Sequence, residues 1–344
     1  MIKTKKLVIL GIALAILLAV NLMQKRGHTK ATSQAARVEL VQSDIVPGDL
    51  SRITVGFGAE TELIVLSNTP VGWTVDTAWH AAANLSRVET LVRNWSGVQG
   101  EYRSDNADVL ADYGLVGESV LSLRAYNPAG DEVMALDLGR KIDQGQGNFV
   151  RQPDNNKVYL TQTNLMAQLG IYSADKAPQG RYFLKLQAMS EDRLQVDQMT
   201  ITDADGKRTF VKIFATEEPD SAGAVPEIDR STFEWQLASS PATVLVKTKV
   251  DAVLNSLVAV RATDLVDPKV PLTDYGLDVA ERSASLTLQD GRTIVLHFGD
   301  EREAVDEAPA GTFMQLEGEP TVWIVTDYAV KNIFKSLADL EPGS

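Results

Sequence analysis

The side chains that most often perform enzyme chemistry are scarce in this chain and far apart along it. The 344 residues hold no cysteine and three histidines, His28, His80 and His297. A histidine-ligated zinc site or a catalytic triad requires several such side chains to converge at one point. His28 follows an apolar segment, His80 falls in a predicted helix and His297 alternates within a predicted strand, so their positions disfavour convergence. We therefore predict no catalytic and no metal-binding residue, and we expect a protein that is not an enzyme.

Sequence motifs of nucleotide-binding sites and of serine hydrolases are also missing from the sequence. There is no Walker loop and no G-x-S-x-G nucleophile elbow, and Gly56-Phe57-Gly58 lacks the later glycine of a dinucleotide-binding fingerprint. We therefore predict no cofactor and no cofactor-binding residue. The sequence leaves the identity of any small-molecule ligand open.

Acidic side chains gather at two predicted turns. Residues 202–207, TDADGK, imitate part of a calcium loop, but the distal glutamate is absent and predicted strands flank the segment, so we expect a hairpin turn. Asp105, Asn106 and Asp108 could bind a cation, yet Asx turns are the usual role of such residues in a loop. Asp105 and Asp267 are the carboxylates that an alternative, enzymatic function would use.

Charge is distributed unevenly along the chain. Residues 1–30 carry six of the 33 basic side chains and none of the 46 acidic ones, so the remainder holds 27 basic and 46 acidic residues, a formal charge of −19. A body this negative repels phosphate backbones and anionic headgroups. We therefore exclude nucleic acid as an expected partner.

The basic residues at the N-terminus flank a long apolar segment. Residues 7–23 read LVILGIALAILLAVNLM, seventeen residues with Asn21 as the one strongly polar side chain. A helix of this length spans about 25 Å, close to the hydrocarbon thickness of a bilayer. Gln24-Lys25-Arg26 stands where a signal peptidase needs small residues, and no cysteine is present to carry a lipid. We expect residues 1–30 to form a single uncleaved transmembrane anchor with basic flanks.

The orientation of this anchor is predicted from the short tail before it. Three lysines precede the apolar segment and three basic residues follow it, so the basic-residue rule gives almost no bias. A short N-terminal tail ahead of a first apolar segment usually stays inside. We expect a single-pass protein of the inner (cytoplasmic) membrane with its C-terminal body in the periplasm.

The rest of the chain contains an internal repeat. The string Asp-Tyr-Gly-Leu occurs at residues 112–115 and again at 274–277, an offset of 162. The same offset places further identical residues opposite each other, two of them tryptophans. These pairs are Trp73 with Trp235, Val88 with Val250, Val98 with Val260 and Asp105 with Asp267. We infer that the string repeats because the fold repeats.

Each copy contains one amphipathic segment with helical spacing. From Asp76 to Trp95 apolar residues recur at steps of three and four, which marks one face of a helix. In the second copy Ser240 is the predicted N-cap and Pro241 the first helical residue. The apolar residues that follow with the same spacing are Val246, Val250, Val253 and Leu257.

Alternating apolar residues predict antiparallel strands around each helix. Strands are expected at 53–57 and 62–66 in the first copy and at 198–202 and 209–214 in the second, with about four more beyond each Tyr-Gly-Leu. The predicted fold class is α+β, with two tandem repeats of an antiparallel sheet that each carry one main packed helix, preceded by a single N-terminal transmembrane helix.

The domain limits follow from these patterns. We place the first α+β repeat domain at residues 38–175 and the second at 181–340, with SADKAPQGR, residues 173–181, as the hinge. The second copy has an acidic insertion between Phe214 and Trp235 and an acidic run at 300–307. Solvated loops are the expected structure, and a docking surface for a basic partner is the alternative.

The Asp-Tyr-Gly-Leu string itself has a predicted structural role. Gly114 and Gly276 are expected to supply a left-handed backbone turn. The tyrosine and leucine of each copy are expected to pack against the helix.

The paired pattern of a tryptophan strand, an amphipathic helix, DYGL, a hairpin that ends in glycine, and then VYL or VWIV resembles a known family, the domain of unknown function 4340 (DUF4340). The resemblance covers about residues 50 to 338 in two tandem copies. Family members usually have a proline soon after Tyr-Gly-Leu, where this chain has Val116-Gly117 and Asp278-Val279-Ala280. The family is often encoded beside permeases and auxiliary subunits of ABC transporters related to gliding-motility exporters, and it implies no catalytic residue.

Three functions are therefore open. The leading hypothesis is a membrane-anchored periplasmic accessory subunit of an ABC-type transport, export or envelope complex, which acts by protein–protein or substrate interaction. Its expected partners are the membrane, through the N-terminal helix, and an ABC transporter permease or auxiliary subunits. The alternatives are a carboxylate-dependent enzyme for cell-wall or glycan substrates and a scaffold that binds peptides or glycans along sheet edges.

Overall fold

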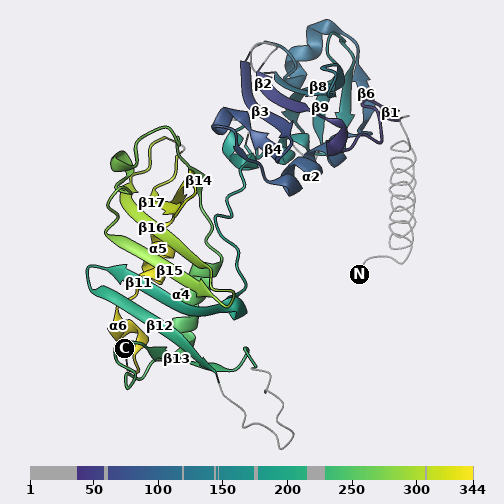
Figure 1. Ribbon diagram of the computed structural model, residues 1–344. Coiled ribbons are helices and arrows are strands. Elements are labelled where there is room, and N and C mark those ends of the chain that lie inside the picture. The colour runs from purple at the N-terminus through teal and green to yellow at the C-terminus, as the bar shows by residue number, and fades with distance from the viewer. Residues whose placement is uncertain are drawn as a thin grey trace, which may run out of the picture. The chain divides into compact units, whose positions relative to one another are not determined.

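The computed structural model describes residues 37–57, 61–117, 120–142, 145, 147–173, 177–214, 229–306 and 308–343. These residues form two antiparallel sheets with few helices (Figure 1), so the protein belongs to the α+β class with mostly β structure. The predicted anchor at residues 1–30 lies outside the described residues. Within them, no helix has both the length and the apolar character needed to cross a bilayer.

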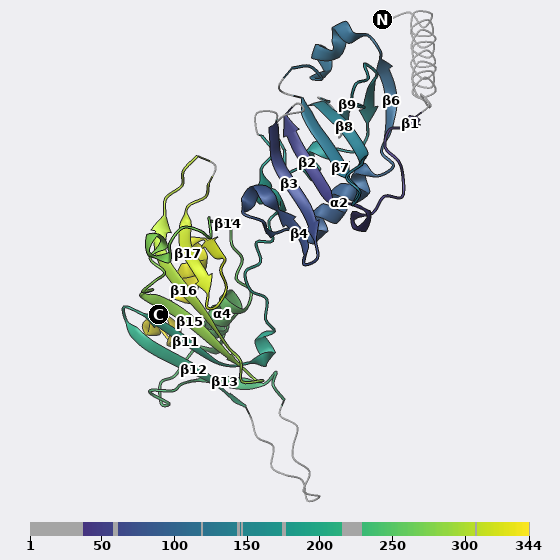
Figure 2. The same cartoon turned by 45° about the horizontal axis from the view of Figure 1, so that its top comes forward.

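The first sheet has ten strands in the order β1-β6-β10-β9-β8-β7-β2-β3-β4-β5 (Figure 2). Its central strands bury apolar side chains opposite each other, as Ile53 faces Ala125 and Val55 faces Leu123. The strands are β1 (Arg37–Glu39), β2 (Arg52–Phe57), β3 (Thr61–Thr69), β4 (Gly72–Val75), β5 (Ala81–Ala82), β6 (Gln99–Ser104), β7 (Leu121–Tyr126), β8 (Glu132–Lys141), β9 (Asn148–Arg151) and β10 (Val158–Thr161).

The second sheet has eight strands in the order β13-β12-β11-β15-β16-β17-β18-β14. The predicted strands at 198–202 and 209–214 are confirmed as a hairpin, and the TDADGK segment forms its turn, with Asp203 paired to Gly206. The strands are β11 (Val196–Asp203), β12 (Gly206–Phe214), β13 (Phe233–Leu237), β14 (Asp264–Leu265), β15 (Arg282–Leu288), β16 (Thr293–Arg302), β17 (Gly311–Leu316) and β18 (Val322–Val325).

The two sheets share one strand order. Strands β2, β3 and β4 have the places of β11, β12 and β13, strands β7 to β10 have those of β15 to β18, and β6 has that of β14. The run β6-β10-β9-β8-β7-β2-β3-β4 of the first sheet then matches the whole second sheet, read from β14 to β13. The internal repeat of the sequence therefore coincides with a repeat of strand order.

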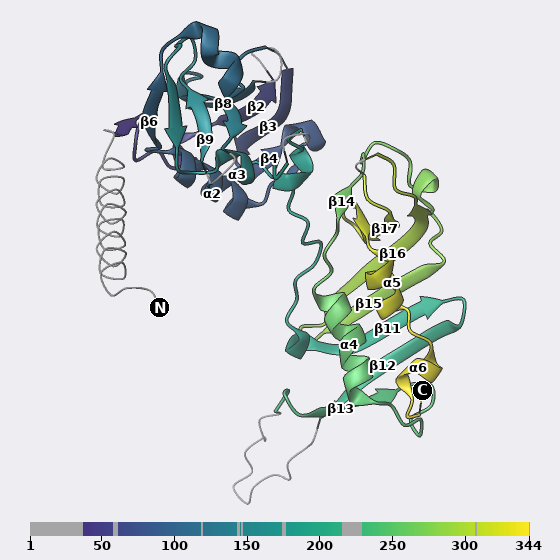
Figure 3. The same ribbon diagram turned by 180° about the vertical axis from the view of Figure 1, so that it is seen from behind.

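One amphipathic helix accompanies each sheet. Helix α2 (Leu85–Trp95) buries Val88, Leu91, Val92 and Trp95, at the predicted spacing. Helix α4 (Lys247–Val258) lies with α5 and α6 on one face of the second sheet (Figure 3). The remaining helices are α3 (Leu165–Gln168), α5 (Asp327–Ile333), α6 (Leu337–Leu340) and the 3-10 helices η1 (Pro47–Asp49), η2 (Asp76–Ala78), η3 (Ala107–Tyr113), η4 (Gly180–Phe183), η5 (Arg193–Gln195) and η6 (Leu272–Tyr275).

Both main helices begin later than the sequence pattern predicts. The segment from Asp76 forms η2 and then β5, because the backbone of Ala81 and Ala82 pairs with β4, so α2 begins at Leu85. In the second copy the predicted cap at Ser240 is wrong. Residues 240–243 close a turn of their own, with the Thr243 N–H donating to the Ser240 carbonyl at 3.0 Å, and α4 begins at Lys247.

The Tyr-Gly-Leu corner has the predicted backbone but a different packing partner. Gly114 and Gly276 take φ values of 67° and 65°, which confirms the left-handed turn. The corner does not pack against the helix. Its tyrosines lie over phenylalanines of the sheet, Tyr113 over Phe149 with ring centroids 4.7 Å apart and Tyr275 over Phe313 at 4.6 Å.

The corner and α4 lie on opposite faces of the second sheet. Phe313 and Ile324 belong to the apolar cluster around the corner, whereas their neighbours Met314 and Val325 belong to the cluster around α4. Adjacent residues of a strand point to opposite faces, so each of these strands serves both clusters.

Two further pairs of glycines bring backbone segments close together in the same way in both copies. A Cβ on Gly139 or Gly299 would meet the carbonyl oxygen of Tyr113 or Tyr275 at 2.3 or 2.0 Å. A Cβ on Gly147 or Gly311 would likewise meet the carbonyl oxygen opposite it on β10 or β18, at 2.0 or 2.3 Å. The repeated fold therefore requires glycine at the same structural points.

Backbone contacts divide the chain into two compact units, Met1–Asn68 with Ser86–Gln179 and Thr69–Leu85 with Gly180–Ser344. Residues 69–85 join the second unit because Ala83 bridges to Leu184 and the Asn84 N–H donates to the Phe183 carbonyl at 2.6 Å. The domain limits at 38–175 and 181–340 stay a prediction.

Candidate functional site

The carboxylates that the enzymatic alternative would use serve as turn residues. Asp105 hydrogen-bonds to Tyr102, and Asp267 accepts the backbone N–H of Lys269 at 2.9 Å. The Asx turn expected near Asp105 is confirmed, because the side chain of Asn106 accepts the Asp108 N–H at 3.0 Å. Asp105 follows β6 and Asp267 follows β14, so the two carboxylates lie in loops of different compact units.

The histidines are not brought together either. His80 contacts Asp76 at 3.0 Å in the loop before β5, and His297 lies in β16. His28 is outside the described residues. Across the described ranges, no group of three or more histidine, aspartate or glutamate side chains is arranged to hold a metal ion.

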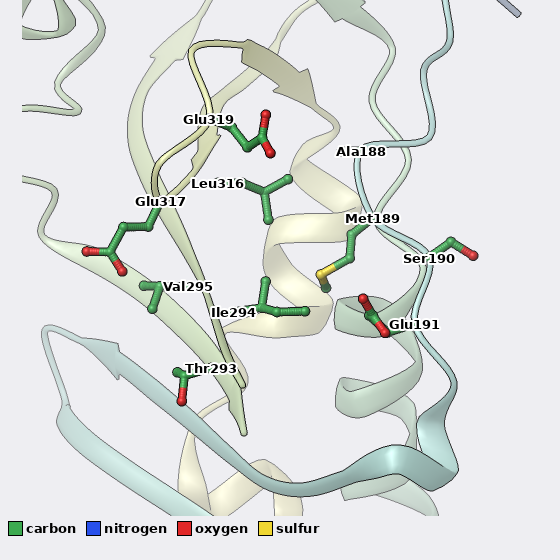
Figure 4. Close-up of a pocket in the computed structure, with 10 residues that line it drawn as sticks. All are labelled: Ala188, Met189, Ser190, Glu191, Thr293, Ile294, Val295, Leu316, Glu317 and Glu319. Atoms are coloured by element: carbon green, nitrogen blue, oxygen red, sulfur yellow. The ribbon is translucent and has the colours of Figure 1, made fainter. Parts of the chain in front are cut away.

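A hollow of about 350 Å³ lies beside the second sheet (Figure 4). Three separate stretches of chain line it: residues 188–191 ahead of η5, residues 293–295 at the start of β16, and residues 316–319 at the end of β17. Sequence reasoning did not find this hollow, because no local motif marks a surface that three distant segments assemble.

Backbone hydrogen bonds hold the three segments in place. The Ala188 N–H donates to the Val260 carbonyl at 3.0 Å, and the Glu191 N–H donates to the Val258 carbonyl at 2.8 Å, so the first segment is tied to the end of α4. The Glu317 N–H donates to the Val295 carbonyl at 2.9 Å, which ties β17 to β16. Backbone hydrogen bonds therefore connect the hollow to α4 and to the sheet.

The lining combines apolar and acidic side chains. Met189, Ile294 and Leu316 pack against the core around α4, and in Figure 4 they lie between Glu191 on one side and Glu317 on the other. Glu319 stands above them. This arrangement suits a ligand group that is apolar along its length and positively charged at its end.

The first sheet has a hollow at the equivalent place. It measures about 190 Å³ and is lined by residues 40–42, 132–135 and 152–153. The same backbone bond anchors its leading segment, since the Leu40 N–H donates to the Val98 carbonyl at 2.9 Å. Here the Gln152 amide donates to the Leu40 carbonyl at 2.9 Å across the hollow, where the second copy has Leu316.

Comparison with known families decides what the chain is related to. The family model described as "Domain of unknown function (DUF4340)" matches residues 73–278, more than half of the chain. The protein belongs to the DUF4340 family. The match is one continuous span that begins at Trp73 in β4 and ends just past the second Tyr-Gly-Leu corner. No curated protein and no solved structure shows significant similarity to this DUF4340 chain.

A cluster of charged and aromatic side chains of the DUF4340 protein lies on the face of the second sheet that α4 covers. Lys212 of β12 is 4% exposed, and its ammonium donates to the Arg193 carbonyl at 2.5 Å and lies 4.5 Å from the Phe233 ring centroid. Lys247 stacks on the same ring at 3.8 Å. Burial, together with the charges of Arg230 and Arg193, lowers the pKa of Lys212 to about 8.

Two aspartates balance part of this positive charge. Asp251 accepts hydrogen bonds from Lys247 at 2.7 Å and from the Trp235 indole at 2.8 Å. Burial opposes ionisation of Asp251, but these bonds outweigh it and lower its pKa. Asp197 pairs with Arg230. Cation–aromatic stacking and ion pairing thus join β12, β13, α4 and η5, and the cluster braces the fold.

Proposed function

We propose that this DUF4340 protein is a non-catalytic accessory subunit of an ABC-type transport, export or envelope complex. A binding role is supported by one observation above all, the unbridged hollow beside the second sheet, at a place where the first sheet has a smaller hollow bridged by a hydrogen bond. Its apolar and acidic lining offers a contact surface for a protein segment. The partners we propose are a permease or auxiliary subunits of the transporter, as the family resemblance implies.

The architecture we propose is a tandem duplication behind a membrane anchor. Shared strand order, paired glycines at the close approaches and the repeated corner support two copies of one module. The apolar residues 7–23, with basic flanks, support a transmembrane helix. We place the protein in the inner membrane as a single-pass subunit with its C-terminal body in the periplasm.

A periplasmic peptide-binding scaffold is the second candidate, and the hollow beside the second sheet favours it. The two candidates differ in what residues 1–30 must do. A transporter subunit needs its anchor to stay in the complex, whereas a peptide-binding scaffold keeps its binding activity without it.

Affinity purification at native expression tests the proposal. The full chain, extracted in mild detergent, is expected to retain an ABC permease or auxiliary subunit through washing. A variant that lacks residues 1–30 and is exported by a cleavable signal is expected to lose that partner and the transport phenotype. Purification of the full chain as a clean monomer, with no loss of phenotype on truncation, would remove the proposal.

A further inference from the structure

We propose that the hollow beside the second sheet binds a short segment of a partner polypeptide in which a lysine or arginine adjoins apolar residues. This inference rests on the proposed binding function and names the chemistry of its ligand. The floor of the hollow, its rim and its counterpart in the first sheet support this assignment.

The floor of the hollow is apolar and only partly covered. Met189 is 6% exposed, and Ile294 and Leu316 are half-buried against the core around α4. The volume of about 350 Å³ is at the lower end of the range for pockets that enclose small ligands, which fits one or two side chains. Among the residues that the structure describes, no aromatic side chain lines the hollow, so they offer no stacking surface for a sugar or a base.

The rim of the hollow is acidic. Glu191, Glu317 and Glu319 are the lining carboxylates (Figure 4), with the Glu317 side chain directed away from the apolar floor, and no basic side chain is among the lining residues. Arg292 approaches Glu191 to 3.9 Å, but its shorter ion pair, at 2.7 Å, is with Asp290. The remaining negative charge complements a cationic side chain, whose aliphatic stem would cover the apolar floor.

The smaller hollow in the first sheet differs from the one in the second sheet, and this difference is why we propose peptide binding at the second hollow alone. The bond from Gln152 to the Leu40 carbonyl crosses the smaller hollow, and its one lining carboxylate, Glu132, pairs with Arg124 at 3.5 Å. In the second sheet Leu316 cannot form the corresponding bond, so the hollow stays open. The two copies therefore differ at this place, with a smaller hollow bridged by a hydrogen bond in the first sheet and a larger, unbridged hollow in the second.

Peptide binding to the full chain in maltoside micelles tests the assignment. The probe is a fluorescein-labelled peptide of alternating leucine and lysine, and the comparison probe has glutamate in place of lysine. We expect saturable binding of the lysine probe above empty micelles, weakened by added salt because the rim charges are exposed. The glutamate probe is expected not to bind.

Two variants of the hollow and one matched control locate the binding. Combining Glu191→Gln, Glu317→Gln and Glu319→Gln is expected to lower the affinity for the lysine probe by about tenfold or more, because it removes the complementary charge. Leu316→Gln, which introduces the bridging residue of the first sheet, is also expected to lower the affinity for the lysine probe. Glu132→Gln in the first hollow is the control and is expected to leave affinity unchanged. Unaltered near-ultraviolet circular dichroism establishes that each variant is folded.

Equal affinity for both probes, or unchanged affinity in both second-sheet variants, would overturn the inference. Retention of the transporter subunit by the triple glutamine variant, with no probe binding by the wild type, would reject this ligand while the proposed function stands. Probe binding by a wild-type chain that retains no transporter subunit would reject the proposed function and support the ligand.

Discussion

The corner-bearing faces of the two sheets hold different polar groups at equivalent positions. In the first sheet Asp137 of β8 pairs with Arg124 of β7 at 2.7 Å and with Arg151 of β9 at 3.0 Å. Matching Gly139 with Gly299 aligns Asp137 with His297, and matching Phe149 with Phe313 aligns Arg151 with Gln315. Arg124, which faces Ala135, then corresponds to Ser285, which faces Val295. One copy therefore has a charged triad where the other has serine, histidine and glutamine in the same strand framework.

The helix-bearing faces differ in the same manner. The strand pairs Ile53–Leu66 and Met199–Phe210 are equivalent, which aligns Asn68 with Lys212. Asn68 donates to the Leu50 carbonyl at 3.0 Å and Lys212 to the Arg193 carbonyl at 2.5 Å. Both positions thus tie the segment around the preceding 3-10 helix to the sheet. The framework requires a donor at this point, and the identity of the donor is free to change.

The largest expected effect comes from the glycines that the two copies share. Gly139→Ala and Gly299→Ala would each push a Cβ into a tyrosine carbonyl, so each should destabilise its own sheet by about 3–5 kcal/mol. Hydrogen exchange with mass spectrometry can measure this sheet by sheet. Gly48→Ala, whose Cβ would meet no atom within 4 Å, is the control and should change stability by less than about 0.5 kcal/mol. Equal stability of all three variants would contradict the close contact between these glycines and the tyrosine carbonyls in the two copies.

Mutation of the charged triad should give the next largest loss of stability, and this loss should be confined to the first sheet. Asp137→Asn leaves two largely buried guanidinium groups without their carboxylate, which should destabilise the first sheet by about 2–4 kcal/mol. His297→Asn at the equivalent position should cost less than about 0.5 kcal/mol. Hydrogen exchange of peptides from β7 to β9 and from β15 to β17 separates the two.

A swap of the whole triad sharpens this comparison. Combining Arg124→Ser, Asp137→His and Arg151→Gln gives the first sheet the side chains of the second and leaves no guanidinium without its carboxylate, and the one carboxylate that loses a partner, Glu132, is exposed. We expect it to be less destabilising than Asp137→Asn alone, since removing one partner costs more than removing all. A triple variant that is the less stable of the two would refute the equivalence of the positions.

A pH-dependent difference should come from Lys212. Its pKa is about 8 in the folded protein and 10.5 in the reference state, so the unfolded chain binds more protons between these pH values. The second sheet should therefore gain about 1–2 kcal/mol of stability as pH rises from about 8 to about 10. Urea unfolding of the wild type and of Lys212→Asn, the residue of the first copy, isolates this contribution. The variant should lack the rise, and the same slope in both proteins would show that burial does not lower the pKa of Lys212.

The smallest effect concerns the corner. The Tyr275 hydroxyl donates to the Asp267 carbonyl at 3.0 Å, so Tyr275→Phe should cost about 1 kcal/mol in urea unfolding. Tyr113→Phe retains the ring contact with Phe149 and is the matched variant, with an expected change below about 0.5 kcal/mol. Equal losses in the two variants would indicate that the Asp267 bond does not stabilise the second corner.

Much of the fold could be predicted because its signals are local. Alternation of apolar residues predicted the paired strands at 53–57 and 62–66 and at 198–202 and 209–214, since a strand with one buried face must alternate. The left-handed turns at Gly114 and Gly276 were predictable because glycine adopts them without strain. The helix starts were not, because pairing of Ala81 and Ala82 with β4 competes with helix formation and leaves no mark in the helical spacing.

By itself, the sequence determined the duplicated pattern, the α+β class and the family, because periodicity, identical residues at one offset and family motifs are properties of the chain alone. Tertiary structure alone decided that Tyr113 and Tyr275 pack on Phe149 and Phe313 of the sheets, because these partners lie more than 30 residues away along the chain. It also decided the open hollow, because the segments at 188–191, 293–295 and 316–319 meet after the sheet has formed.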